Sequence, residues 1–442
     1  MAIQKNFAPI PENTLILGAD KYFCMDGRVT HVNNNVLVVG RSGSGKTRYL
    51  VKPNLLQCNG SYVISDPKGM LRKEFESYFK AQGYKVLSMD FIHPEKSTHY
   101  NPISKIHNTN DIKKLVHAIV YAEASKGRRM EDPYWDLMTA SLLMGIIGYM
   151  FETNDIPKTK RNMSMLEELL YKCNREKNAN TGRAGERNVS KMTKIMENHN
   201  YVMQKRGKES WAYKQFMKVD SAPDKTYQTI ISTAFSKISI FDSEEISMLL
   251  SKDGFDFKVI GQKPTVLFVE VSDTDRSTDI LVNLFYTQLM NELCTYADDK
   301  CKNGCLPVPV QFILDDFATN CRIDGFENMI SNIRSRGIST MLMVQSESQL
   351  VAGYGESAQT IIDNCSSYLY LGGTNFQSAE MAARRSNRPV HEILNMPIDS
   401  CWLFRIGEKP AMVDFVDIDA FQAQKKFVPF VGLDDTREGL AM

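Results

Sequence analysis

No stretch of this sequence is apolar for long enough to cross a bilayer, and no segment has the layout of a signal peptide. The longest nearly uninterrupted apolar stretch, Ser141 to Phe151, is too short to span one. The nine cysteines form no C-x-x-C pair, and Cys301 and Cys305 have no histidine nearby that could complete a zinc site. We therefore expect a cytosolic protein whose thiols are reduced.

An excess of charge of one sign is also missing from the chain as a whole, because 53 Lys and Arg face 52 Asp and Glu. The distribution is uneven, however. Residues 156–218 hold 15 Lys and Arg against 6 Asp and Glu, which leaves a net charge of −8 for the rest of the chain. At 442 residues, with 43% hydrophobic residues, the sequence predicts a globular protein of two domains, or one domain with a large insertion.

The first positive feature is a P-loop. A strand-like apolar segment at residues 35–39 runs into the pattern G-x-x-x-x-G-K-T, and a helix is expected to begin near Lys46. Glycines let such a loop wrap a phosphate, and the loop N–H groups and the helix dipole then face the anion. Lys46 is predicted to reach the β- and γ-phosphates, and the Thr47 hydroxyl to hold Mg²⁺. We therefore expect ATP and Mg²⁺ as cofactors, bound by Gly40, Arg41, Ser42, Gly43, Ser44, Gly45, Lys46 and Thr47.

Strand-like and helical segments alternate after the P-loop, with strands at residues 60–65 and 85–90 around a helix at 71–82. Such alternation predicts an α/β fold with a mainly parallel sheet that binds ligands at the carboxyl ends of its strands. Asp66, Lys68 and Asp90 then lie on the P-loop edge, and Asp66 and Lys68 are candidate nucleotide contacts. A simple turn at Asp66-Pro67 explains the same residues equally well.

A second nucleotide-site signal lies in the last third of the chain, where an apolar strand at 308–314 ends in Asp315 and Asp316. In a chain with a P-loop this is the Walker B pattern: Asp315 is predicted to hold Mg²⁺, and Asp316 to orient or deprotonate the attacking water. A pair of helix-capping aspartates is the alternative. Gln345, at the end of a strand at 339–344, is placed to sense the γ-phosphate. Further strands are expected at 264–271 and 367–372, with a hairpin at 401–415.

Between residues 108 and 241 strand signals vanish and helical periodicity takes over. We therefore expect an all-α domain at 108–241, inserted between two parts of a nucleotide-binding domain at 1–107 and 242–442. The insertion holds the basic surplus, which is densest at residues 158–161 and around Lys205, Arg206 and Lys208. Such a surface can attract the phosphate backbone of DNA, but it can also be an ordinary solvated face.

The motifs together resemble one family, the TraG/TraD-type coupling proteins of type IV secretion and conjugation. The resemblance rests on the P-loop, the D-P-K-G run at 66–69, the Walker B aspartates and the Q-S-x-x-Q-L pattern at 345–350. It implies a RecA-like domain interrupted by an all-α domain, and a hexameric ring. The ring would couple ATP hydrolysis to moving DNA, or a DNA–relaxase complex, into the secretion channel. In such rings a neighbouring subunit supplies an arginine; Arg334 falls at that position, with Arg336 as the close competitor.

The chain departs from the family pattern in two ways. Family members normally open with a pair of transmembrane helices, which this sequence does not have; we expect either a trimmed chain or a separate membrane partner at the inner face of the bacterial cell membrane. The second Walker B acid is usually glutamate, and here it is Asp316, whose shorter side chain can slow hydrolysis. We expect a poor ATPase that is largely monomeric until DNA or a partner assembles the ring.

Two other functions stay open on the sequence alone. The chain could be an ATP-binding receptor that docks relaxosome or effector proteins without moving DNA. It could also be a translocase of the FtsK/HerA group, although those proteins do not need the D-P-K-G run or the inserted helical domain.

Overall fold

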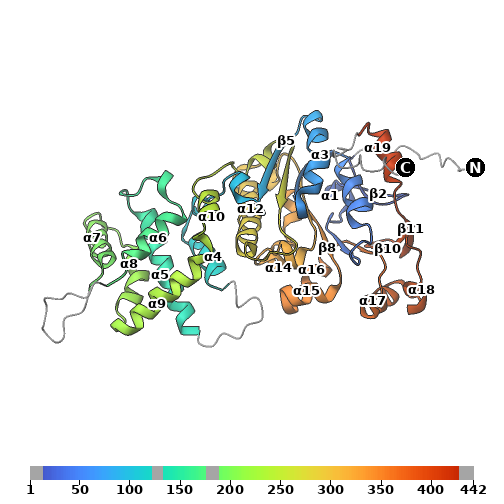
Figure 1. Ribbon diagram of the computed structural model, residues 1–442. Coiled ribbons are helices and arrows are strands. Elements are labelled where there is room, and N and C mark those ends of the chain that lie inside the picture. The colour runs from blue at the N-terminus through green and yellow to red at the C-terminus, as the bar shows by residue number, and fades with distance from the viewer. Residues whose placement is uncertain (1–12, 122–132, 176–188, 428–442) are drawn as a thin grey trace, which may run out of the picture. The chain divides into compact units, whose positions relative to one another are not determined.

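The structure, a computed structural model, describes residues 13–121, 133–175 and 189–427 (Figure 1). The chain divides into two compact units. The α/β unit comprises Met1–Ile92, Phe257–Thr274 and Leu289–Met442, and the helical unit comprises His93–Asp256 and Asp275–Gln288. The chain therefore leaves the α/β unit and returns to it twice.

The α/β unit is built on one large sheet, whose strands within the described ranges follow the order β11-β10-β9-β3-β8-β7-β4-β6-β5. All neighbouring strands from β9 to β5 are parallel, and β10 and β11 are antiparallel additions at one edge. This confirms the mainly parallel sheet that the alternation of strands and helices predicted. The strands are β3 (Val36–Val39), β4 (Ser61–Ser65), β5 (Lys85–Asp90), β6 (Thr265–Glu270), β7 (Val310–Leu314), β8 (Ile338–Val344), β9 (Ser367–Tyr370), β10 (Ser400–Arg405) and β11 (Ala411–Asp414). A separate hairpin joins β1 (Thr14–Gly18) and β2 (Lys21–Cys24).

The central strands are buried on both faces, which is why they read as continuous apolar runs. On one face, Phe75 and Phe79 of a helix pack with Tyr62 and Phe268 of the sheet in a single core cluster. The helices that surround the sheet are α1 (Gly27–Thr30), α2 (Lys52–Leu55), α3 (Met70–Ala81), α11 (Val259–Gln262), α12 (Asp279–Lys300), α13 (Phe317–Asn320), α14 (Phe326–Met329), α15 (Glu347–Tyr354), α16 (Ala358–Asp363), α17 (Phe376–Ser386), α18 (Val390–Leu394) and α19 (Ile418–Gln424). Helix α12 contributes residues to both units.

The helical unit is organised around α5 (Pro133–Glu152), which packs against α4, α6, α8 and α9 (Figure 1). Its glycines allow this packing: a Cβ at Gly145 would lie 2.9 Å from the Phe216 nitrogen, and one at Gly148 would lie 3.0 Å from the Trp211 ring. None of the described helices is long and apolar enough to cross a membrane. The surrounding helices are α4 (Thr109–Val120), α6 (Met163–Tyr171), α7 (Lys191–Lys205), α8 (Trp211–Asp220), α9 (Asp224–Ile238) and α10 (Glu244–Leu249).

The unit boundaries lie at 92/93 and 256/257, whereas the sequence suggested 107/108 and 241/242. The two segments between these positions bind each other. The Tyr100 N–H donates to the Leu249 carbonyl at 2.8 Å, the Gly254 N–H donates to the His99 carbonyl at 2.9 Å, and Ser104 Oγ donates to Asp253 at 2.6 Å. Because the entering and leaving segments pair in this way, both belong to the helical unit.

Candidate nucleotide site

The P-loop lies at the carboxyl end of β3 and is followed by a wide π-type turn, Lys46–Val51, that leads into α2. Gly45 has φ +83°, and a Cβ there would collide with the Tyr49 ring, so both the conformation and the space require glycine. A Cβ at Gly40 would lie 2.6 Å from Ser44 Oγ and 2.9 Å from the Leu371 Cβ. Ser44 Oγ itself is buried and has no hydrogen-bond partner within the described part of the chain. The loop is therefore a close cradle that contains a polar atom without a protein partner.

Lys46 is 8% exposed, and its ammonium donates to the Gly40 carbonyl at 2.7 Å and to the Arg41 carbonyl at 3.4 Å. It thus folds back over its own loop instead of pairing with a carboxylate. Thr47 follows it and is half-buried, while Arg41, Ser42 and Gly43 are exposed. The partners of Lys46 are neutral carbonyls, which the charged oxygens of an anion can replace.

Asp315 follows β7, and among the described strands of the sheet β8 alone separates β7 from β3. Burial raises the pKa of Asp315 above its usual range, the charge of Asp316 raises it further, and the Lys46 ammonium opposes both effects. Within the described residues this carboxylate accepts one hydrogen bond, from the Asp316 N–H at 3.0 Å. A buried carboxylate with so little protein compensation suits a divalent cation as its partner.

Asp316 and Gln345 meet at this edge. Gln345 follows β8, and its side-chain amide donates to Asp316 Oδ1 at 3.3 Å. Asp316 lies in the left-handed region, with φ +46° and ψ +46°. This conformation is tolerated better by aspartate than by glutamate, because the short side chain can satisfy local backbone groups. The loop geometry thus offers a physical reason for an aspartate where the family pattern usually has glutamate.

The D-P-K-G run lies elsewhere on the same edge. Strand β4 is the third neighbour of β3, which places its end about 14 Å from the P-loop strand. The Asp66 carboxylate is 1% exposed and accepts the N–H groups of Leu71 at 2.9 Å and Arg72 at 2.7 Å, at the start of α3. Lys68 has φ +71°, and its ammonium pairs with Asp273 at 3.0 Å. The structure therefore does not bring Asp66 and Lys68 together with Lys46.

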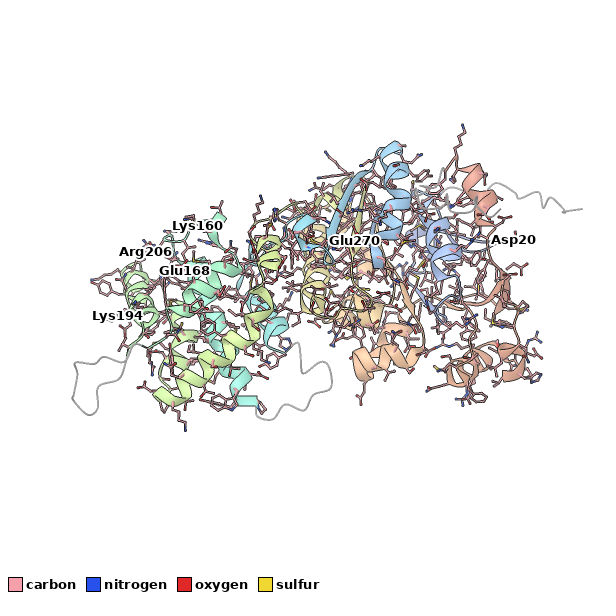
Figure 2. The ribbon with its side chains drawn as sticks, in the orientation of Figure 1. Asp20, Lys160, Glu168, Lys194, Arg206 and Glu270 are labelled. Carbon is pink, nitrogen blue, oxygen red and sulfur yellow. The ribbon has the colours of Figure 1, made fainter. Side chains whose placement is uncertain are left out.

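Neighbouring carboxylates complete this second group. Glu270 ends β6 and pairs with the Arg72 guanidinium at 2.7 Å, and Asp90 ends β5 and accepts the Ile92 N–H at 2.8 Å. Burial raises the pKa of Asp66 to about 6, against which the N–H groups and the charge of Arg72 act. Burial also raises the pKa of Glu270, which is 7% exposed and is labelled on the α/β unit in Figure 2.

Arg334 lies at the amino end of β8, in the turn Ile333–Arg336 that leads into this strand. The P-loop lies at the other end of the strands, their carboxyl end. The length of β8 separates Arg334 from Gln345 by roughly 20 Å. Its guanidinium donates to the Gly27 carbonyl at 2.6 Å and is exposed. Arg336 is instead fixed by both oxygens of Asp298, at 2.9 and 2.7 Å, and this ion pair raises its pKa. Neither arginine contacts the P-loop of its own chain.

In the helical unit, the basic clusters are divided between surface and interior. Lys160, Lys194 and Arg206 are exposed and lie on its outer helices (Figure 2). Arg175 is buried: it pairs with Asp220 and Asp224, and its guanidinium lies 3.7 Å from the Tyr227 ring centroid. Part of the positive surplus therefore stabilises the helical core and is unavailable to a partner.

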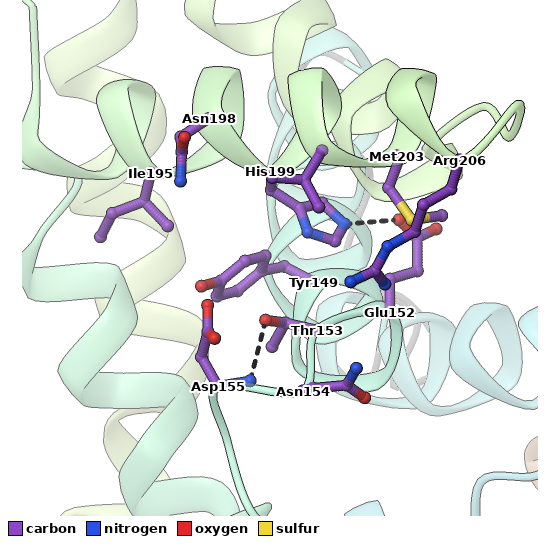
Figure 3. A pocket seen from close by; sticks show the side chains of 11 residues that line it. Tyr149, Glu152, Thr153, Asn154, Asp155, Ile195, Asn198, His199, Met203 and Arg206 are labelled. Atoms are coloured by element: carbon purple, nitrogen blue, oxygen red, sulfur yellow. Dashed lines mark hydrogen bonds and ion pairs between the residues drawn. The ribbon is translucent and has the colours of Figure 1, made fainter.

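A cavity of about 290 Å³ lies between the end of α5, the turn at 153–155 and α7 (Figure 3). Glu152 stands beside it and accepts the Ser210 hydroxyl at 2.6 Å, the Ala212 N–H at 3.1 Å and a His199 ring nitrogen at 3.0 Å. One carboxylate thus ties α7 and the start of α8 to α5. Arg206 is among the lining residues.

Two residues of the site had no predicted role. Glu347 is buried at the start of α15, where it accepts the Tyr368 hydroxyl at 2.7 Å and lies 3.5 Å from the Arg385 guanidinium. Gln349 accepts the Gln345 N–H at 2.9 Å. Gln345 precedes the helix, so this bond joins a backbone N–H ahead of α15 to a side chain of its first turn. The S-x-x-Q run at 346–349, a pattern typical of helix starts, was the available signal.

Comparison with known proteins identifies the family of this chain. The model of the family described as "Type IV secretory system Conjugative DNA transfer" matches residues 1–385. The conjugal transfer protein TraG of Escherichia coli is 23% identical over 362 residues, covering 77% of this chain and 53% of TraG. Protein VirD4 of Rhizobium radiobacter is 23% identical over 354 residues, covering 76% of this chain and 45% of VirD4. The chain spans about half the length of these curated relatives.

Solved structures of the conjugative coupling protein TrwB show the same fold. The trigonal form with sulphate has a TM-score of 0.64 at 16% identity and covers 95% of this chain and 93% of TrwB. The complex with ADPNP has a TM-score of 0.61 at 17% identity, covering 86% and 85%, and that with ADP and Mg²⁺ has 0.58 at 15%, covering 93% and 96%. The expected fold, a RecA-like P-loop domain interrupted by an all-α domain, is confirmed.

Proposed function

This chain belongs to the type IV secretory system family of conjugative DNA transfer, and we propose that it is an ATP-driven motor that moves DNA, or a DNA–relaxase complex, into a type IV secretion channel. The observation that carries the proposal is the convergence of Lys46, Asp315 and Gln345 at the carboxyl ends of β3, β7 and β8, three neighbouring strands. In parallel α/β sheets this edge is where a nucleoside triphosphate is bound and cleaved.

The P-loop fits a nucleotide phosphate. The unpartnered Ser44 Oγ, alone among the described residues of the loop, and the lack of room for a side chain at Gly40 are what a loop closing around an anion requires. TrwB has been solved with ADPNP and with ADP and Mg²⁺. Both facts support binding of MgATP here, which would supply the γ-phosphoryl group to be cleaved and the cation that offsets its charge.

Each residue of the site then has a defined task. Lys46 exchanges its contacts with the Gly40 and Arg41 carbonyls for phosphate oxygens. The Thr47 hydroxyl and the Asp315 carboxylate would hold Mg²⁺, and Asp316 would orient the attacking water and accept its proton. Gln345, already bonded to Asp316, links that carboxylate to the state of the γ-phosphate.

Asp66 and Lys68 take a different role from the one expected of them. Asp66 holds the start of α3, and Lys68 is paired with Asp273 three strands from the P-loop. We propose that Asp66 positions this turn and that Lys68 does not contact the nucleotide of its own subunit.

Arg334 is the residue that would complete a neighbour's site. Arg334 precedes β8 and Gln345 follows it, so Arg334 is too far away to contact a nucleotide bound to the P-loop of the same subunit. Its guanidinium donates to the Gly27 carbonyl. Arg336 is fixed by Asp298. A ring of subunits, a hexamer in this proposal, would bring Arg334 to the adjacent P-loop, where a cation stabilises transition-state charge.

DNA contact is assigned to the helical unit. Lys205, Arg206 and Lys208 are exposed at the end of α7 and just beyond it. Their charge suits a phosphate backbone, with an affinity that falls as salt rises. The proposed assembly works at the inner face of the bacterial membrane with relaxase and channel proteins as partners.

The test is ATP turnover of the purified chain, with and without single- and double-stranded DNA, over a range of protein concentrations. We expect DNA to stimulate turnover, and the rate per subunit to rise steeply with concentration. Arg334→Ala should lower it roughly 100-fold or more, since a trans arginine is worth at least that much. Arg336→Ala, the matched control, should keep most of the activity.

Mixing identifies the trans arrangement. Arg334→Ala subunits mixed with Lys46→Ala subunits should recover turnover, because the first supplies an intact P-loop and the second an intact arginine. Tight ATP binding without turnover in any condition would contradict the motor and favour the receptor that docks substrates.

A further inference from the structure

Hydrogen bonds form a closed ring that includes Asp316 and Gln345, the two residues proposed to act on the attacking water and the γ-phosphate. The Gln345 side chain donates to Asp316 Oδ1 at 3.3 Å, and the Gln345 backbone N–H donates to Gln349 Oε1 at 2.9 Å. Gln349 Nε2 donates to Thr319 Oγ1 at 3.3 Å. The Thr319 hydroxyl donates to the Asp316 carbonyl at 3.0 Å, and the Thr319 N–H reaches the same carbonyl at 2.9 Å. The ring therefore holds Asp316 by its carboxylate and by its backbone.

The ring fixes the direction of each bond. A hydroxyl has one hydrogen to donate, and Thr319 Oγ1 already accepts from Gln349, so its own hydrogen is directed at Asp316. The Gln349 amide is used at both ends, as acceptor for Gln345 and as donor to Thr319. Methionine at 349, or valine at 319, would fill nearly the same space without these bonds.

Asp316 needs such support because it lies in the left-handed region, which costs a residue with a Cβ roughly 1 kcal/mol. The helices that carry the ring are themselves firmly packed. Phe317 of α13 stacks on Tyr354 of α15 with centroids 5.3 Å apart, and the Tyr354 hydroxyl accepts the Ile323 N–H at 2.9 Å. Gly353 lies so close to α13 that a Cβ there would be 3.1 Å from the Ala318 carbonyl. Gln349 thus bridges a rigid platform and the end of β8.

We propose that Gln349 is a positioning residue that couples Gln345 to the backbone of Asp316. A shift of the Gln345 peptide on nucleotide binding or hydrolysis is passed through this one side chain to Thr319, and from there to the residue that orients water. This inference rests on the proposed ATPase function.

The experiment compares Gln349→Met, Thr319→Val and the double variant with the wild-type chain. We expect each single variant to lower kcat roughly 10-fold, since small displacements of a catalytic group are costly, with KM for ATP changed less than about threefold. The double variant should be no worse than about twofold below the poorer single, because both break the same ring. Gln359→Met is the matched control: it removes an equivalent bond to Asp363 on α16 that has no connection to Asp316, and kcat should not change.

A second measurement does not depend on turnover. Hydrogen exchange at the Gln345 amide should be roughly 10-fold faster in Gln349→Met than in wild type, and the change in protection of residues 316–320 that ATP causes should be lost. Unchanged kcat with a faster-exchanging Gln345 amide would overturn the coupling role. The coupling role would also be overturned if the two single losses of kcat multiplied in the double variant, or if Gln359→Met lowered kcat as much as Gln349→Met.

Failure of the ATPase function gives a different result. In that case the wild-type chain binds ATP without turnover, and the exchange measurement alone decides. Nucleotide-linked protection at 316–320 that disappears in Gln349→Met supports the coupling, and protection that persists rejects it.

Discussion

Charged groups lie at two places along the carboxyl ends of the strands, and the two groups differ in how many protein partners they have. At the ends of β3, β8 and β7 the charged groups have few protein partners, and Lys46 has no carboxylate partner among the described residues. Lys46 has only carbonyl contacts among the described residues, Ser44 Oγ has no partner there, and Asp315 is bonded by its own neighbour. At the ends of β4 and β6 the carboxylates have protein partners: Asp66 accepts two N–H groups of α3, and Glu270 forms an ion pair with Arg72. Ser65 Oγ and Glu270 Oε1 nevertheless have no hydrogen-bond partner among the described residues.

The difference separates a ligand site from a structural cluster. An unsatisfied buried atom does not by itself separate the two places, because Ser65 Oγ and Glu270 Oε1 lack a hydrogen-bond partner as Ser44 Oγ does. The charged groups separate them: a helix start holds Asp66, whereas Lys46 has only carbonyl partners among the described residues. Both places hold a lysine and an aspartate whose pKa is raised by burial, and both come from motifs of the same family pattern. Pairing distinguishes them, and pairing can be tested by making the same substitution at both.

The largest contrast is expected between the two lysines. Lys46→Ala should lower ATP turnover roughly 100-fold or more and weaken ATP binding, because the charge that faces the phosphates is lost. Lys68→Ala should change turnover less than about threefold, since its ammonium is already neutralised by Asp273. Turnover and equilibrium binding of a fluorescent ATP analogue measure both effects. A large loss of turnover in Lys68→Ala would place the D-P-K-G turn in a nucleotide site, that of a neighbouring subunit included.

The second contrast concerns stability without nucleotide. Asp66→Ala leaves the Leu71 and Arg72 N–H groups without their acceptor and should destabilise α3 by about 2 kcal/mol. Asp315→Ala removes a carboxylate whose pKa is raised by burial, and it should cost less than about 1 kcal/mol. Native-state hydrogen exchange of the helix amides measures the local free energy of opening for both variants. A local measurement is needed because a chain of two units does not have a single free energy of unfolding. Equal losses of stability in Asp66→Ala and Asp315→Ala would contradict the assignment of Asp66 to a structural cluster and Asp315 to a ligand site.

Sequence patterns were sufficient for most of the fold. The strand segments match closely because buried parallel strands are continuous apolar runs, as at β3, β6 and β8. The positions of Lys46, Asp315 and Gln345 at strand ends followed from the same patterns, and their chemical roles are proposals. The unit boundaries differed because the pairing of residues 93–107 with 242–256 joins segments far apart in the chain.

The site was less predictable where it depends on sheet order. Local sequence places Asp66 at the correct edge, but only the crossovers put β7 and β8 between β4 and β3. The partner of Lys68, Asp273, is likewise distant in sequence. The role of Gln349 depends on the side chain of Thr319, from another strand-to-helix turn. No periodicity along the chain encodes such contacts.

The last expected effect is a pH dependence of stability at Asp66. The native pKa of Asp66, about 6, is above the ordinary value of 3.8, because burial outweighs the α3 N–H groups and the charge of Arg72. Native protein therefore binds this proton more tightly than unfolded protein, and the stabilisation is complete below about pH 4 and lost as pH rises through 6. Glu270, which faces Asp66 from β6, shifts in the same direction. The Asp66→Asn variant does not titrate at this position, so the wild-type chain should lose roughly 2 kcal/mol relative to it between pH 4 and 7.

Hydrogen exchange of α3 in both proteins, corrected for the intrinsic pH dependence of exchange, measures this difference. The Asp66→Asn substitution also changes the α3 bonds, but that offset is the same at every pH, so only the slope is informative. A flat difference would mean that Asp66 keeps an ordinary pKa and that the N–H groups of α3 and the charge of Arg72 compensate fully for its burial. The group at the ends of β4 and β6 would then be a stabilised anion site, and Asp66 would differ from Asp315 in pKa as well as in partners, because burial raises the pKa of Asp315 and no helix start holds its carboxylate.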